Sequence, residues 1–154
     1  MKKILCILVV LMMVMPATLA TDNRVPLGVS MDTLISRMSA NHSKLGMTGK
    51  IQYVTDGLYM YGDYVIYGFS GDSKSMDAVY MLGTGDGSLT SGLEIIQAAT
   101  AFVVAVDDTL SLDKSGDVIM ELVEGSGVVI RGNIVFVCVK DDSVGTMFTA
   151  TKHK

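Results

Sequence analysis

The chain has few of the residues that build covalent bridges or metal sites. It contains two cysteines, two histidines and two prolines in 154 residues. Cys6 lies in an apolar N-terminal run, so Cys138 is left alone if that run is removed, which excludes an internal disulfide. His42 and His153 stand far apart and exclude a zinc signature. With one proline after residue 20, the body is predicted to be well ordered and not linker-rich.

The first twenty residues have the order of a secretory signal. Two lysines follow the initiating methionine, and an apolar run over residues 4–15 ends at Pro16. Small residues then lead to Ala20, where we expect cleavage. The alternative is an uncleaved anchor, which needs about 20 apolar residues to span a bilayer. The run stops well short of that length, so we expect a signal peptide over residues 1–20 and a secreted or periplasmic protein.

Basic residues are also scarce. The chain has 12 basic and 16 acidic residues, a formal charge of −4. Cleavage after residue 20 removes two lysines and no acid, which lowers the charge of the mature protein to −6. Nucleic acid and anionic membranes bind basic surfaces, so neither is an expected partner. The partner is then a protein or a small-molecule ligand.

The first half of the mature chain predicts one helix followed by a meander. The helix begins after Ser30, a favourable N-cap, and its apolar residues recur at helical spacing up to Met38. Glycine-containing turns then separate runs rich in tyrosine and valine, with Asp56-Gly57 as the clearest hairpin signal. The predicted strands cover residues 48–54, 58–61, 64–69 and 76–82.

The second half predicts two helices and a second meander. After the glycine-rich loop Gly83–Gly87, Ser91 and Glu94 form a capping-box signature ahead of a helix that is apolar on most sides. Its tail, Val103–Val106, is equally compatible with a buried strand. A short helix over residues 117–124 and strands over 128–131, 134–140 and 144–151 follow.

These elements predict one globular α+β domain over residues 21–154. We expect an antiparallel sheet of short strands in two meanders, packed against two main helices. The similar order of elements in the two halves suggests a pseudo-twofold repeat. The run Ile134–Val139 is apolar on both alternating faces and is expected to be an interior strand covered on both sides. Cys138 lies within it and is expected to be a buried, unreactive thiol.

Two loops suggest anion or metal binding but lack the complete motif. Gly83–Gly87 precedes a helix, as phosphate loops do, yet it has no P-loop lysine and favours a flexible connection. A group of four aspartates raises the question of calcium, but the glycine that an EF-hand loop requires is missing. Aspartates at turns and caps explain these positions better. The four aspartates are Asp107, Asp108, Asp113 and Asp117. No cofactor and no metal ion are expected.

No catalytic residue is predicted. His42 is expected to be exposed near a helix C-terminus, and His153 to lie in a frayed terminus. A carboxylate pair could act as acid and base, but Glu94, Glu121 and Glu124 each have a structural explanation.

All six tyrosines lie in the first meander, which is the most unusual local feature. Tyrosine suits recognition surfaces because it offers contact area with a polar tip. Alternation places Tyr59 and Tyr61 on one face of their strand, so that face could be aromatic and solvent-facing. The predicted function is therefore a non-catalytic binding domain; the alternatives are a small carboxylate-dependent hydrolase and an immunity or inhibitor protein. The predicted binding residues are Tyr59, Tyr61, Tyr64 and Tyr67.

Overall fold

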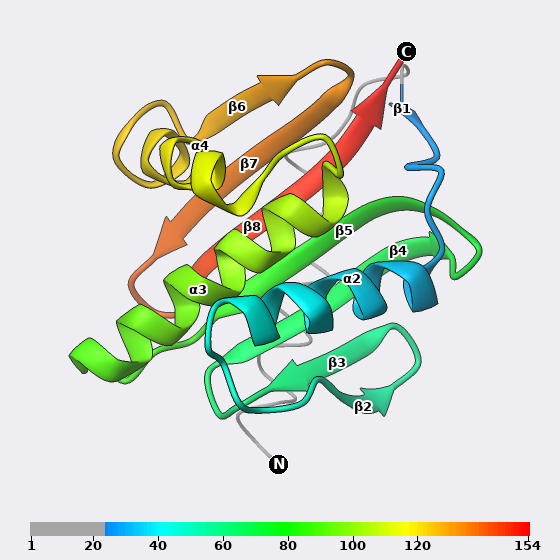
Figure 1. Ribbon diagram of the computed structural model, residues 1–154. Helices are drawn as coiled ribbons and strands as arrows, with labels where there is room; N and C mark the ends of the chain where they lie inside the picture. The colour runs from blue at the N-terminus through cyan, green and yellow to red at the C-terminus, as the bar shows by residue number, and fades with distance from the viewer. Residues whose placement is uncertain (1–23) are drawn as a thin grey trace.

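Three helices lie on one face of an antiparallel sheet in this computed structural model, which describes residues 24–154 (Figure 1). The predicted α+β class is confirmed, and the predicted signal peptide lies outside the described residues. The helices are α2 (Met31–Lys44), α3 (Leu89–Val106) and α4 (Leu112–Glu124). The strands are β1 (Arg24–Val25), β2 (Gln52–Thr55), β3 (Leu58–Tyr61), β4 (Val65–Asp72), β5 (Ser75–Gly83), β6 (Val128–Arg131), β7 (Ile134–Asp141) and β8 (Gly145–His153).

The sheet consists of two meanders joined at its centre. The strand order is β2-β3-β4-β5-β8-β7-β6, and the short β1 pairs with the end of β8. Each meander therefore ends in one of the two central strands. The two central strands, β5 and β8, pair antiparallel, with Tyr80 of β5 opposite Thr149 of β8. This arrangement fits the predicted pseudo-twofold repeat.

The helices above the central strands run antiparallel as well (Figure 1). The Asn41 amide of α2 donates to the carbonyl of Ala101 in α3 at 3.4 Å. One turn earlier in α3, the Gln97 amide donates to the carbonyl of Leu45, just past α2, also at 3.4 Å. As the chain advances from Asn41 to Leu45, its partner in α3 moves back from Ala101 to Gln97, so the two bonds agree with antiparallel helices.

The main apolar core lies between the helices and the sheet. Met31, Leu34 and Met38 of α2 are buried there, which confirms the apolar stripe read from the sequence. By length and composition, α3 is the one described helix that could cross a membrane. In this fold its small and aromatic residues, including Ala98 and Phe102, are buried as part of the core.

The start of α3 differs from the prediction. The helix begins at Leu89, and Ser88 is its N-cap, accepting a hydrogen bond from the backbone N–H of Ser91 at 3.1 Å. The predicted capping box at Ser91 and Glu94 is therefore wrong. Ser91 is buried inside the first turn and donates back to the carbonyl of Ser88 at 3.0 Å. The tail of α3 through Val106 is helical, which settles the alternative left open by its sequence.

Two further elements differ from their predicted extent. α4 begins at Leu112, five residues before the predicted start, and includes Gly116. A glycine inside a helix costs only about 1 kcal/mol, which burial of Ile119 and Leu122 offsets. β7 is also not covered on both sides by described helices, because all three helices lie on one face of the sheet (Figure 1).

Candidate ligand-binding site

A crevice of about 610 Å³ opens at one end of the helix pair. It lies where the segment before α2, the C-terminal end of α3, the β6–β7 turn and the end of β8 meet. Its apolar part includes Val29 and Ile134. Its polar part contains charged side chains of both signs, namely Arg37, Asp107, Asp108, Arg131 and Lys152.

Asp107 is the buried acid of the crevice. It is 5% exposed and follows the last residue of α3 as its C-cap. Nε of Arg131 donates to its Oδ2 at 2.6 Å, while the backbone and hydroxyl of Thr109 donate to Oδ1 at 3.1 and 2.6 Å. Burial raises the pKa of the Asp107 carboxyl, but the bonds from Thr109 and Arg131 outweigh burial and hold that pKa below its usual value. Asp107 is therefore a structural anion.

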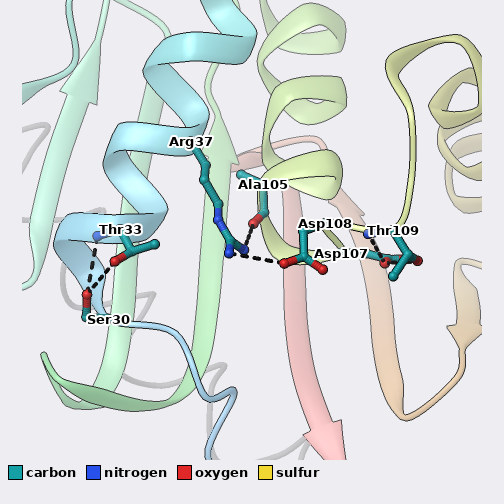
Figure 2. A network of polar contacts seen from close by, with 7 residues as sticks. All are labelled: Ser30, Thr33, Arg37, Ala105, Asp107, Asp108 and Thr109. Atoms are coloured by element: carbon teal, nitrogen blue, oxygen red, sulfur yellow. Dashed lines mark hydrogen bonds and ion pairs between the residues drawn. The ribbon is translucent and has the colours of Figure 1, made fainter.

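Arg37 reaches from α2 to the end of α3, as Figure 2 shows. One terminal nitrogen donates to the carbonyl of Ala105 at 3.3 Å, and the other lies 3.1 Å from Oδ2 of Asp108. A cation is favoured here because the last carbonyls of a helix carry partial negative charge. Both side chains of the ion pair are partly exposed, so this pair is weaker than the one between Asp107 and Arg131.

Cationic donors remain in the crevice after these pairs are formed. Among residues 24–154, Lys152 has no ion-pair partner, although it lines the same crevice. Arg131 uses Nε for Asp107, and its two terminal nitrogens make no hydrogen bond within the described range. The crevice thus offers more positive charge than its own carboxylates neutralise, in a protein that is acidic as a whole.

The four predicted tyrosines do not form one surface. Alternation along β3 is as expected, but the face that carries Tyr59 and Tyr61 is the one covered by helices. Tyr61 and Tyr67 are 6% and 1% exposed, so the prediction of a solvent-facing aromatic surface is wrong for both. Tyr59 is half-buried, and Tyr64 lies half-buried in the following turn, where its hydroxyl donates to Asp86 at 3.0 Å.

One exposed tyrosine does lie at the sheet edge. Tyr53 of β2 is 62% exposed and lies edge-on to Tyr59, with ring centroids 5.7 Å apart. Its hydroxyl donates to Asp56 at 2.8 Å. Tyr53 is exposed because β2 is an edge strand at the end of the sheet order, whereas Tyr59 on β3 is half-buried.

His42 is buried, contrary to the expectation of an exposed histidine. Its Nε2 is hydrogen-bonded to the hydroxyl of Tyr67 at 2.8 Å, and its ring lies edge-on to Tyr61. Burial lowers the pKa of His42 to about 4. The His42 side chain points from the last turn of α2 toward Tyr67 of β4. Its position near the helix C-terminus did not predict this direction.

The other predicted candidates remain separate from the crevice. Within residues 24–154, no group of three histidine, cysteine or carboxylate side chains could hold a metal ion. Asp113 and Asp117 are exposed on α4. In the glycine-rich loop, Asp86 accepts hydrogen bonds from Ser88 and Tyr64, which hold the pKa of its carboxyl well below the usual range. A fixed negative charge at the start of α3 opposes anion binding there.

Two side chains differ in part from their predicted roles. Cys138 is half-buried, and burial raises the pKa of its thiol, which agrees with low reactivity. His153 lies in β8 and pairs with Arg24, so it does not belong to a frayed end.

The sequence did not point to the crevice as a whole. Its charged residues lie far apart along the chain, and only Asp107 and Asp108 belong to a candidate group predicted from the sequence, the four aspartates. The signals were an aspartate directly after a long apolar helix and an arginine at a hairpin turn, both of which are common at the surface. No protein-family model, no curated protein and no solved structure matches this chain.

Proposed function

We propose that this protein is a non-catalytic binding domain that holds a small carboxylate-bearing ligand in the crevice at the end of α3. One observation carries the proposal: Arg131 and Lys152 retain unpaired cationic donors in a crevice of a protein whose net charge is negative. Its volume of about 610 Å³ lies within the ordinary range for small-molecule sites, about 300–1,000 Å³.

The chemistry of the unused donors favours a carboxylate. The terminal nitrogens of a guanidinium form a planar fork that matches the two oxygens of a carboxylate. Asp107 holds Arg131 through Nε, which fixes the guanidinium while leaving that fork available. Lys152 adds a point charge from β8, and Val29 and Ile134 provide apolar contact for the rest of a ligand.

The same geometry speaks against acid–base catalysis in the crevice. A general acid at neutral pH needs a raised pKa. The pKa of Asp107 is lowered, and its oxygens are already occupied by Thr109 and Arg131. Within residues 24–154, the carboxyl whose pKa is raised is Glu94, by burial and then by the charge of Asp63, and Glu94 does not line the crevice.

A titration with small anions tests this function. Acetate, succinate and inorganic phosphate are added separately to ¹⁵N-labelled protein, and amide shifts are followed by NMR. We expect succinate or acetate to shift the amides of Gly132 and Asn133, which line the crevice. Replacing Lys152→Met should weaken this binding at least about tenfold, which corresponds to loss of one charge-assisted contact.

Lys114→Met is the matched control, because Lys114 is an exposed lysine outside the crevice. It should leave binding unchanged. The proposal is wrong if none of the carboxylates moves the crevice amides, or if both lysine variants weaken binding equally. A stronger response to phosphate than to succinate would replace the proposed ligand class.

Export is part of the same proposal. The leader over residues 1–20 supports a secreted or periplasmic location, where a compact binding domain without disulfides would meet its ligand outside the cytoplasm. N-terminal sequencing of the protein recovered from the cell exterior should start at Thr21. Recovery of the intact leader would contradict export by cleavage.

A further inference from the structure

The cationic crevice continues onto an edge of the sheet. β6 is the last strand in the sheet order and lies at the outer margin of the sheet (Figure 1). Ile130 of β6 lines the crevice next to Arg131 and the β6–β7 turn. The Ile130 side chain is 68% exposed. A ligand that is held by Arg131 can therefore extend from the crevice along this edge.

The pairing of β6 with β7 shows which backbone groups of β6 point outward. The N–H of Cys138 donates to the carbonyl of Gly127 at 2.7 Å, so these two residues form a hydrogen-bonded pair. Bonded and non-bonded pairs alternate along an antiparallel ladder. Every second residue counted from Gly127 therefore bonds to β7, whereas Val128 and Ile130 direct their N–H and C=O groups to the outer edge.

Ser126 covers the first of these two positions. Its hydroxyl donates to the carbonyl of Val128 at 2.8 Å and accepts from the N–H of the same residue at 3.2 Å. Ile130 has no such cover, because its N–H and C=O have no hydrogen-bond partner within residues 24–154. Unpaired groups on an edge strand are a template for another strand. Ile130 therefore offers one donor and one acceptor right beside the crevice.

We propose that the ligand is the C-terminal end of an extended polypeptide, which adds to the β6 edge and places its terminal carboxylate in the crevice. This inference rests on the carboxylate site of the proposed function and extends the ligand beyond it. The charges agree, because the cations Arg37, Arg131 and Lys152 exceed the carboxylates Asp107 and Asp108 by one. One terminal carboxylate neutralises that excess. Main-chain bonds to a sheet edge are a recurring mode of peptide recognition.

The position of the crevice sets the direction of the added strand. β6 runs from Val128 to Arg131, toward the crevice. A polypeptide whose C-terminus lies in the crevice must run the same way, so it is parallel to β6. In a parallel ladder, Ile130 donates to the carbonyl of the third residue from the end and accepts from the N–H of the last residue. The terminal carboxylate then lies beside Gly132 and the terminal nitrogens of Arg131.

The same register assigns the side chain of the penultimate residue. This residue lies opposite Ile130, and paired residues direct their side chains to the same face of a sheet. The exposed Ile130 side chain offers it an apolar contact. We therefore expect a β-branched apolar residue at the penultimate position.

Peptide binding followed by amide shifts of the ¹⁵N-labelled protein tests the inference. The probe is a short acetylated peptide of alternating threonine and valine, with valine as the penultimate residue and a free terminal carboxylate. It should bind at least about tenfold more tightly than acetate, because it adds main-chain hydrogen bonds. The amide of Ile130 should shift together with that of Gly132. The same peptide with a terminal amide should bind at least about tenfold more weakly, because it lacks the charge.

N-methylation of the peptide tests edge addition with the protein unchanged. A methyl group on the last amide nitrogen removes the donor to Ile130 and should weaken binding at least about tenfold. The matched control carries the methyl group on the penultimate amide nitrogen, which points away from β6. The control should bind as tightly as the unmethylated peptide.

A protein variant tests the other bond. Ile130→Pro removes an N–H that β7 does not use, a change that edge strands tolerate. It should weaken peptide binding at least about tenfold and leave acetate binding unchanged. Ile130→Thr keeps the N–H and should bind the peptide within about threefold of wild type. If Ile130→Pro does not fold, the methylated peptides decide.

The outcomes separate this inference from the proposed function. Edge addition is wrong, and the carboxylate site stands, if the peptide binds no more tightly than acetate or if both methylated peptides bind alike. Both proposals fail if neither acetate nor the peptide shifts the crevice amides.

Discussion

Nε2 of His42 lies 2.8 Å from the hydroxyl oxygen of Tyr67, and this bond ties the last turn of α2 to the covered face of β4. Each side chain would otherwise bury a polar group at considerable cost, because both are 1% exposed. The pair therefore fixes the helix on the sheet, and removing either partner leaves the other unsatisfied.

The stability of the protein should fall on acidification through His42. Its pKa is lowered by burial to about 4 from 6.5, so between these values the unfolded chain binds a proton that the folded chain does not. The contribution of neutral, buried His42 to the free energy of unfolding is complete above pH 6.5 and is lost as the pH falls toward 4. Urea unfolding at about pH 7.5 and about pH 4.5 should differ by about 2–3 kcal/mol from this group.

The His42→Gln variant isolates this effect from carboxylate titration. It should be less stable than wild type at neutral pH, and its stability should change less between the two pH values. An identical pH dependence in both proteins would show that His42 does not titrate as described.

The two ion pairs of the crevice should differ in their contribution to stability. Arg131→Ala leaves the buried Asp107 without its guanidinium partner and should lower the free energy of unfolding by about 1–3 kcal/mol. Arg37→Ala breaks a pair with the largely exposed Asp108 and should cost less than about 1 kcal/mol. Urea unfolding of both variants checks this order. Equal losses would contradict the assignment of Asp107 as the structural anion.

The tyrosines should separate into structural and surface residues. Tyr61→Ala removes a buried ring that contacts His42 and should cost about 3–5 kcal/mol. Tyr53→Ala removes an exposed edge ring and should cost less than about 1 kcal/mol. Thermal unfolding of the two variants measures the difference. A near-wild-type melting temperature for Tyr61→Ala would mean that this ring is not part of the core.

Two glycines should respond in opposite directions to alanine. At Gly68 an added Cβ meets the Tyr80 ring, so Gly68→Ala should destabilise the fold by about 1–3 kcal/mol. At Gly92, inside α3, an added Cβ meets nothing within 4 Å, and Gly92→Ala should stabilise the helix by up to about 1 kcal/mol. Chemical denaturation of both variants tests this. Stabilisation by Gly68→Ala would show that Tyr80 does not lie across the glycine.

Local patterns in the sequence were enough to predict most elements. Residue spacing identified α2 and its cap at Ser30, and glycine-containing turns separated the strands of both meanders. The start of α4 was missed because Gly116 resembles a helix break, whereas burial of the following apolar residues outweighs its low propensity.

The sequence by itself determined the helices, the strands and the alternation of side chains along them, because these depend on neighbours within a few residues. Only the tertiary structure decided which side of each strand faces the helices. Alternation separates Tyr61 from Met60 but does not say which of them is covered. The same holds for the crevice, where Arg131, Asp107 and Lys152 meet through the packing of distant segments. Burial of His42 likewise depends on where β4 brings Tyr67, a position set by the whole sheet.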